Sequence, residues 1–153
     1  MKFRISIFIC SLLFLFFVFK TTFKSSDQIS VPTITPTPTP FIEKNSLMVL
    51  IQDWRIQNGL KEYKESSLLC KIASLRLEEI KTDWSHDGFY KMASYCGTMK
   101  CTLGENLARG FASSKDTLNG WLNSPTHKKN LETKFEYTCL ETDGNYVVQI
   151  FGF

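Results

Sequence analysis

The sequence contains two histidines, His86 in the segment SHDGF and His127 in NSPTHKKNL. Imidazole side chains bind transition metals and exchange protons near neutral pH. Both histidines lie in short polar segments about forty residues apart, and no HExxH-type spacing places them on one helix face. The spacing alone therefore leaves three possibilities: a metal site, a catalytic site, or structural hydrogen bonds only.

Four cysteines follow the first forty residues: Cys70, Cys96, Cys101 and Cys139. An even number in an exported domain favours disulfides, with three possible pairings. Cys96 and Cys101 are close enough in sequence to pin one loop, which leaves Cys70 to pair with Cys139. The alternatives are four free thiols, which would suit a cytosolic protein, and a four-cysteine zinc site, for which CxxC pairs are absent.

The first 24 residues have the pattern of a targeting segment. Lys2 and Arg4 form a basic start, and residues 5–19 are apolar apart from two serines. As a helix this run spans roughly 22 Å, against about 30 Å of membrane hydrocarbon, and no A-x-A-type cleavage site follows it. We therefore expect residues 1–24 to be an uncleaved signal anchor that contacts the membrane through residues 5–19; a cleaved signal peptide is the alternative.

The rest of the chain divides into a linker and one domain. Residues 25–41 include VPTITPTPTPF, an alternation of Pro and Thr that is typical of an extended, semi-rigid spacer. Residues 42–153 are long enough to form an independent core. Four of the 18 Lys and Arg residues and one of the 15 Asp and Glu residues precede residue 42, which leaves 14 of each sign in the domain. This balance excludes the basic field of a nucleic-acid-binding protein.

Helices are predicted in the first half of the domain. Apolar residues at helical spacing indicate helices over 45–58 and from about 66 to 81. Ser114 is expected to cap a short helix, and the pair Ser124-Pro125 indicates the start of another. His127 would then lie in the first turn of that last helix.

Turns and strands account for the remaining segments. SHDGF is expected as a turn, and LGENLARGF has no clear period. Residues 135–141 and 146–151 form a predicted hairpin around Asp143-Gly144-Asn145. Helices followed by strands favour an α+β domain built from packed layers.

Four segments in a fixed order resemble the CAP superfamily, which includes cysteine-rich secretory proteins, venom antigens and plant pathogenesis-related proteins. The bacterial branch is the most similar. The resemblance covers roughly 46–153, and its motifs are SHDGF at 85–89, LGENLARGF at 103–111, WLNSPTHKKNLE at 121–132 and YVVQIFG at 146–152.

The resemblance implies an α-β-α sandwich (the CAP, or SCP, fold) with a surface cleft floored by histidines and glutamates. The matching residues here are His86, Glu105 and His127, while Ser124 stands where many members have a second glutamate. Two imidazoles and a carboxylate form a competent Zn²⁺ site with a fourth position for water, and some members of the superfamily bind zinc. Asn106 and Asn130 are predicted to be structural, with side-chain amides that tie loops together.

Three functions remain open at this stage. We expect a membrane-tethered extracellular binding module whose cleft holds a lipid, a peptide or an envelope ligand. The first alternative is a divalent-metal-dependent hydrolase of envelope polymer or peptide, although the residue best suited to act as its base is missing at position 124. The second is a structural interaction protein of the cell envelope. The expected location is the outer face of the membrane, or the medium if the leader is cleaved.

Overall fold

The computed structural model describes residues 41–92 and 102–153. The apolar run at 5–19, the Pro/Thr linker and the predicted Cys96–Cys101 pair lie outside the described residues. Within these two ranges, no helix combines the length and apolar character needed to cross a membrane. The described helices are α1 (Lys44–Gln57), α2 (Ser67–Ile80), α3 (Asp87–Met92), α4 (Ser114–Asn123) and α5 (Pro125–Glu132).

A four-stranded sheet forms the centre of the domain. Its strands are β1 (Lys64–Glu65), β2 (Leu103–Arg109), β3 (Tyr137–Asp143) and β4 (Tyr146–Gly152), in the spatial order β1-β3-β4-β2. β4 pairs antiparallel with both β2 and β3, and the short β1 pairs parallel with β3. The predicted hairpin is therefore confirmed as β3 and β4, and Gly144 in its turn has a positive φ of 58°, which glycine adopts without strain.

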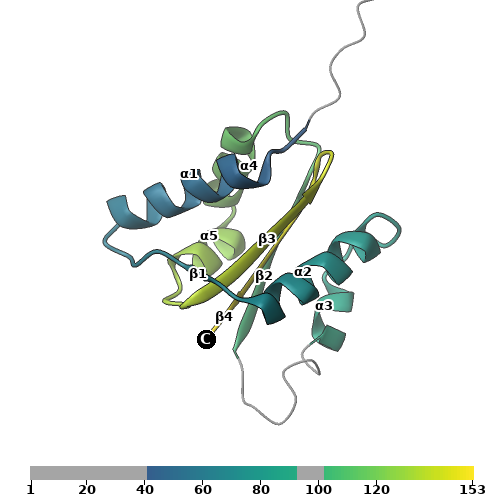
Figure 1. The fold of residues 1–153 in the computed structure, drawn as a ribbon. Coiled ribbons are helices and arrows are strands. Elements are labelled where there is room, and N and C mark those ends of the chain that lie inside the picture. The colour runs from purple at the N-terminus through teal and green to yellow at the C-terminus, as the bar shows by residue number, and fades with distance from the viewer. Residues whose placement is uncertain (1–40, 93–101) are drawn as a thin grey trace, which may run out of the picture. The chain divides into compact units, whose positions relative to one another are not determined.

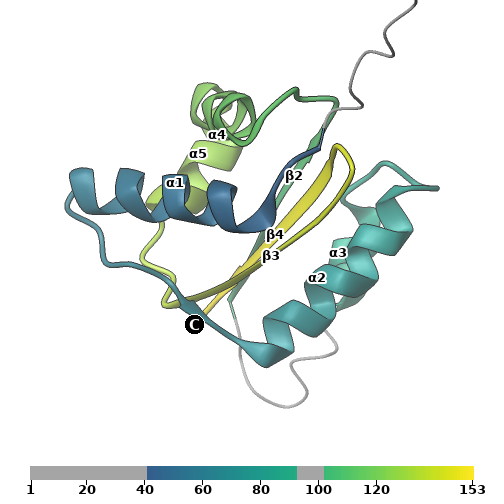
Figure 2. The ribbon, with the colours of Figure 1, turned by 45° about the horizontal axis from the view of Figure 1, so that its top comes forward.

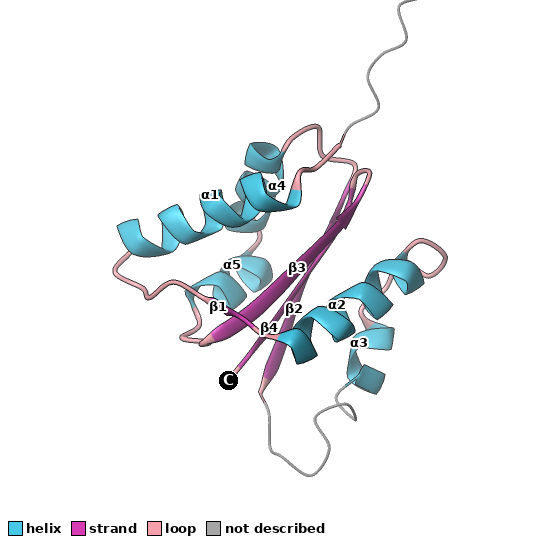
Figure 3. Cartoon of the chain, in the orientation of Figure 1, coloured by secondary structure: helices cyan, strands magenta, loops and turns pink. Residues whose placement is uncertain are grey.

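Helices cover both faces of the sheet (Figures 1 and 2). α1, α4 and α5 lie on one face, and α2 with α3 lies on the other. Each side has its own apolar core: Leu47, Ile51 and Trp121 pack in the first, and Ile72, Leu77 and Ile80 of α2 pack in the second. The predicted layered α+β architecture is thus confirmed for the described domain, and its three layers are visible in Figure 3.

Two segments differ from the sequence-based expectation. LGENLARGF contains β2, whose residues Gly104 to Ala108 are all buried. Because helices cover both faces of the sheet, this strand has no polar side and hence no alternating pattern. SHDGF is only partly a turn, since α3 begins at Asp87 inside it.

Helix starts agree closely with the predicted ones. α1 and α2 begin and end within two residues of their predicted bounds. α4 is capped by Ser113 rather than by Ser114, through a 3.1 Å hydrogen bond from the backbone N–H of Asp116. Pro125 is the first residue of α5, which places His127 in the first turn as expected.

Candidate functional site

His86 is held by a buried carboxylate. Its Nδ1 lies 2.8 Å from Oε1 of Glu105, and the His86 side chain is 50% exposed whereas that of Glu105 is 1% exposed. Glu105 lies near the centre of β2, an edge strand of the sheet, directly opposite Ile150 of β4. The sheet therefore fixes the carboxylate, and the carboxylate fixes the orientation of the exposed ring.

A buried arginine neutralises this carboxylate. Arg76 of α2 is fully buried and donates from Nε to Oε2 of Glu105 at 2.7 Å. Its Nη2 donates to the carbonyl of Ser85 at 2.7 Å, next to His86, and its Nη1 pairs with Glu79. Burial alone would lower the pKa of Arg76, but the hydrogen bonds and charges of Glu105 and Glu79 outweigh it and raise that pKa.

Sequence reasoning missed the role of Arg76. The residue stands on the apolar face of α2, in register with Ile72, Ala73 and Ile80. A charged residue at a core position requires a buried partner of opposite charge. That rule indicates a buried ion pair, but it does not identify Glu105, which lies 29 residues further along the chain.

Two asparagines connect β2 to the helix that carries His127. Asn130 of α5 donates from Nδ2 to the carbonyl of Glu105 at 3.0 Å and to Oδ1 of Asn106 at 2.9 Å. Asn106 in turn donates to the carbonyl of His127 at 3.1 Å. These bonds hold the first turn of α5 against β2 and set the position of His127 relative to Glu105.

The two imidazole rings face the same region of the surface. Their centroids are 6.3 Å apart, with an interplanar angle of 49°. Burial, and to a smaller extent the nearby His86, lowers the pKa of His127. His127 is therefore neutral at pH 7, the form in which imidazole accepts hydrogen bonds and binds metal ions.

Gly88, the glycine of SHDGF, packs closely against the buried ion pair beside the site. A Cβ atom added to Gly88 would overlap the carboxylate of Glu79 and the guanidinium of Arg76. α3 therefore packs on the Arg76–Glu79 pair at a distance that excludes any side chain at position 88. This contact fixes the segment that carries His86.

Comparison with solved structures gives clear similarities. A cysteine-rich secretory protein of Staphylococcus aureus superimposes with a TM-score of 0.64 at 22% identity, over 78% of this chain and 40% of that one. An extracellular SCP-domain protein of Bacillus anthracis gives 0.62 at 21% identity, over 71% and 39%. This chain has the SCP-domain fold.

A third similar structure is an outer surface protein of Borrelia burgdorferi, with a TM-score of 0.61 and 22% identity. The match covers 71% of this chain and 90% of that one. By contrast, the chain spans only about two-fifths of the staphylococcal and bacillar proteins.

None of the protein-family models matches the sequence. None of the curated proteins does so either. The resemblance to the CAP superfamily is thus confirmed at the level of the fold.

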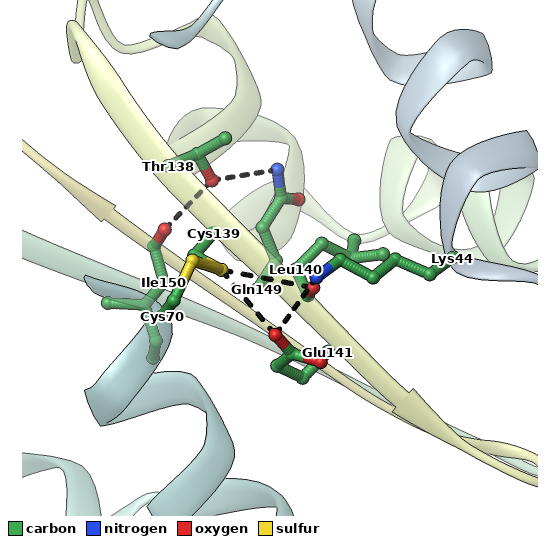
Figure 4. Close-up of a disulfide and its surroundings, with 8 residues drawn as sticks. All are labelled: Lys44, Cys70, Thr138, Cys139, Leu140, Glu141, Gln149 and Ile150. Carbon is green, nitrogen blue, oxygen red and sulfur yellow. Dashed lines mark hydrogen bonds and ion pairs between the residues drawn. A yellow bond between two sulfur atoms is a disulfide. The ribbon is translucent and has the colours of Figure 1, made fainter. Parts of the chain in front are cut away.

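One of the two predicted disulfides lies within the described residues. Cys70 of α2 is bonded to Cys139 of β3, with a Cα–Cα distance of 4.9 Å (Figure 4). The bond joins the α2 layer of the SCP fold to the sheet, as the cysteine pairing predicted. Beside it, the Thr138 hydroxyl donates to the carbonyl of Ile150 at 2.8 Å.

His86, Glu105 and His127 are the side chains that the resemblance implies as metal ligands. Among the described residues, one group of three potential metal ligands has all its donor atoms within 4.8 Å of one another. It consists of Glu65, Cys70 and Cys139. Two of these are the disulfide cysteines, which have no thiolate to offer. The donor atoms of His86, Glu105 and His127 do not all lie within this distance of one another, so the three residues do not form such a group.

The two histidines by themselves come close to the spacing of metal ligands. With Zn–N bonds of about 2.1 Å and tetrahedral angles, two imidazole centroids would lie roughly 5 Å apart. The observed separation of 6.3 Å is roughly 1 Å longer than this. Glu105 lies behind His86, in the place of the carboxylate that orients a metal-binding imidazole in many zinc sites.

Ser124 stands at the position where the resemblance implies a second glutamate. The hydroxyl of Ser124 lies 3.3 Å from that of Thr126. A pocket of about 560 Å³ lies elsewhere in the domain and is lined by residues 55, 59–62, 64 and 134–136. Neither this pocket nor a second one of about 280 Å³ includes His86 or His127.

Proposed function

We propose that this chain is an extracellular, membrane-tethered SCP-type domain that acts by binding, with His86 and His127 as its ligand site. The outside location is supported by the similar structures, which are described as a secretory, an extracellular and an outer surface protein. Tethering through residues 5–19 is supported by the apolar pattern of the leader alone.

The observation that carries the choice of binding over hydrolysis is the state of Glu105. Its Oε2 accepts from Arg76 Nε at 2.7 Å, and its Oε1 lies 2.8 Å from His86 Nδ1. A general base must be free to take a proton from the attacking water. Glu105 is buried and neutralised by a guanidinium, so it orients His86 and is not available as a base.

The exposed ring of His86 is suited to contact a ligand. Because Nδ1 is bonded to the carboxylate, Nε2 is the nitrogen left for an incoming group. The neutral His127 ring lies beside it, so the pair presents two polar edges without a fixed charge on His127. A lipid head group, a peptide or an envelope polymer would each supply partners for such edges.

A second candidate is a divalent-metal site on the same two rings. The carboxylate–histidine contact of Glu105 and His86 is the arrangement that commonly supports a metal-binding imidazole. A bound ion would act as a Lewis acid and lower the pKa of a water molecule. The serine at position 124 would still leave the site without the second carboxylate that could accept a proton from it.

The test compares wild-type full chain with a His86→Gln/His127→Gln variant, in mild detergent. Organic extraction followed by mass spectrometry measures small molecules retained from the expression host. Hydrolysis of isolated cell-wall material, with and without Zn²⁺, is measured in parallel. A Lys129→Gln variant serves as the control, because Lys129 is exposed on α5, two residues from His127.

If the histidine site binds a ligand, the wild type and the Lys129→Gln control retain a compound that the double variant loses. None of the three proteins then hydrolyses the cell-wall material. Equal retention by all three proteins would place binding away from the histidines. Zinc-dependent hydrolysis that the double variant lacks would replace the proposal by the metal-dependent alternative.

A further inference from the structure

The domain contains two buried arginines with different surroundings. Arg76 is fully buried and forms ion pairs with two carboxylates, Glu79 and Glu105. Arg55 of α1 is 1% exposed, yet no ion pair joins it to any carboxylate in the part of the chain that the structure describes. A buried cation without a counter-charge is costly, so its surroundings call for an anion.

The hydrogen bonds of Arg55 all go to neutral groups. Nε donates to the carbonyl of Lys61 at 2.7 Å, and Nη1 donates to the carbonyl of Leu131 at 2.6 Å and to Tyr63 Oη at 2.7 Å. The guanidinium carbon also lies 3.6 Å from the centroid of the Tyr63 ring. These contacts tie α1 to the loop after it and to the end of α5, but they leave the charge uncompensated.

One nitrogen of Arg55 remains available. Its Nη2 forms no hydrogen bond within the described ranges. Among the described residues, Gln149 Oε1 is the fully buried polar side-chain atom that lacks a hydrogen-bond partner. Arg55 Nη2 also lacks a partner but is not fully buried in this sense, so it must retain some access to solvent. Arg55 is one of the residues that line the pocket of about 560 Å³.

The remaining lining of that pocket carries a small excess of positive charge. Besides Arg55, it contains Lys61, Lys64 and Lys134 against Glu62 and Glu136. Lys64 and Glu136 neutralise each other at 2.8 Å. Lys61 and Lys134 are exposed and form no ion pair in the described part of the chain. The apolar side chains of Leu60 and Phe135 complete the lining.

We propose that this pocket, separate from the histidine site, binds the anionic head group of a small molecule, a carboxylate or a phosphate. Guanidinium groups form strong, charge-assisted hydrogen bonds with both kinds of oxyanion. The head group accepts a hydrogen bond from Arg55 Nη2, Lys61 and Lys134 approach it from the rim, and Phe135 contacts the apolar part of the molecule. The structural bonds of Arg55 use Nε and Nη1, so binding at Nη2 does not disturb them.

The experiment uses the full chain in mild detergent, titrated with inorganic phosphate and, separately, with acetate, at constant ionic strength set by chloride. The NMR signal of the Arg55 Nε–H reports on the pocket, and the signal of Arg76 is an internal control. Saturable movement of the Arg55 signal alone, with either anion, supports the proposal. No movement beyond that caused by chloride, or equal movement of both arginines, overturns it.

Variants of the rim lysines locate the site without loss of the fold. Lys61→Ala/Lys134→Ala removes two exposed charges and is expected to weaken the affinity roughly 2- to 30-fold, at the usual strength of exposed charge interactions. Lys115→Ala/Lys129→Ala removes the same charge from exposed positions on α4 and α5, outside the pocket lining, and should leave the affinity unchanged. Equal weakening by both pairs would reduce binding to a general charge effect and contradict the proposal.

Discussion

The Nδ1 atom of His86 lies 2.8 Å from a carboxylate oxygen of Glu105, and the same carboxylate is paired with the buried Arg76. Arg76 donates a hydrogen bond to the second oxygen at 2.7 Å, so its guanidinium neutralises the negative charge of Glu105. His86 is therefore oriented by a neutralised ion pair and presents Nε2 to the surface. This arrangement favours a site that recognises a ligand over one that activates water.

Glu105→Gln should strongly destabilise the domain. The amide would leave the fully buried Arg76 with only the partly exposed Glu79 as a counter-charge, and loss of one partner from a buried ion pair costs about 3–5 kcal/mol. His86→Gln removes only the half-exposed partner and should cost under about 1 kcal/mol. Urea unfolding of both variants measures the difference. Equal, small effects would show that Arg76 does not depend on Glu105.

Gly88→Ala should destabilise the fold although alanine usually favours a helix over glycine. The new methyl group would overlap Glu79 and Arg76, and overpacking of this kind costs about 1–3 kcal/mol. Tyr90→Ala, at an exposed position on the same helix, is the control. Thermal unfolding of the two variants measures the effect. A Gly88→Ala protein as stable as wild type would contradict the close packing of α3 on the ion pair.

Stability should fall as the pH falls through the titration range of His127. Burial lowers the pKa of this histidine below its ordinary 6.5 in the folded state, so the unfolded chain binds the proton first. The free energy of unfolding therefore decreases below about pH 7 and levels off once the pH is below the folded-state pKa. Urea unfolding of wild type and His127→Gln between pH 7.5 and about 5 isolates this contribution. A constant difference between the two proteins over that range would exclude it.

The Cys70–Cys139 disulfide should contribute about 4 kcal/mol, because it closes a loop with a sequence separation of 69. A Cys70→Ala/Cys139→Ala variant should unfold at lower urea concentration than the oxidised wild type. Reductant should destabilise the wild type by more than it destabilises the variant, which keeps Cys96 and Cys101. Identical unfolding midpoints of the two proteins without reductant would mean that the bond adds nothing to stability.

Much of the frame was predictable from local patterns. The apolar spacing of α1 and α2, the Ser124-Pro125 start of α5 and the glycine turn of the hairpin each depend on a few neighbouring residues. β2 was not predictable in this way, because a strand buried on both faces loses the alternation that marks a strand.

The candidate site was predictable only in part. The order of the motifs named His86, Glu105 and His127, and the structure brings these three residues together. The roles of Arg76 and Arg55 depend on partners 29 and 76 residues away, respectively, which no local pattern specifies. A buried arginine in an apolar helix face signals that a partner exists, and only the folded chain identifies it.

The claim that His86 and His127 act as one site is tested most directly by titration of the full chain with Zn²⁺, a probe for which imidazoles are natural ligands. NMR signals of both rings are followed together. If the two histidines form one site, both rings respond with one midpoint at a stoichiometry of one ion, and Lys129→Gln leaves this response unchanged. A response from one ring alone, two separate midpoints, or no response from either ring would contradict a shared site.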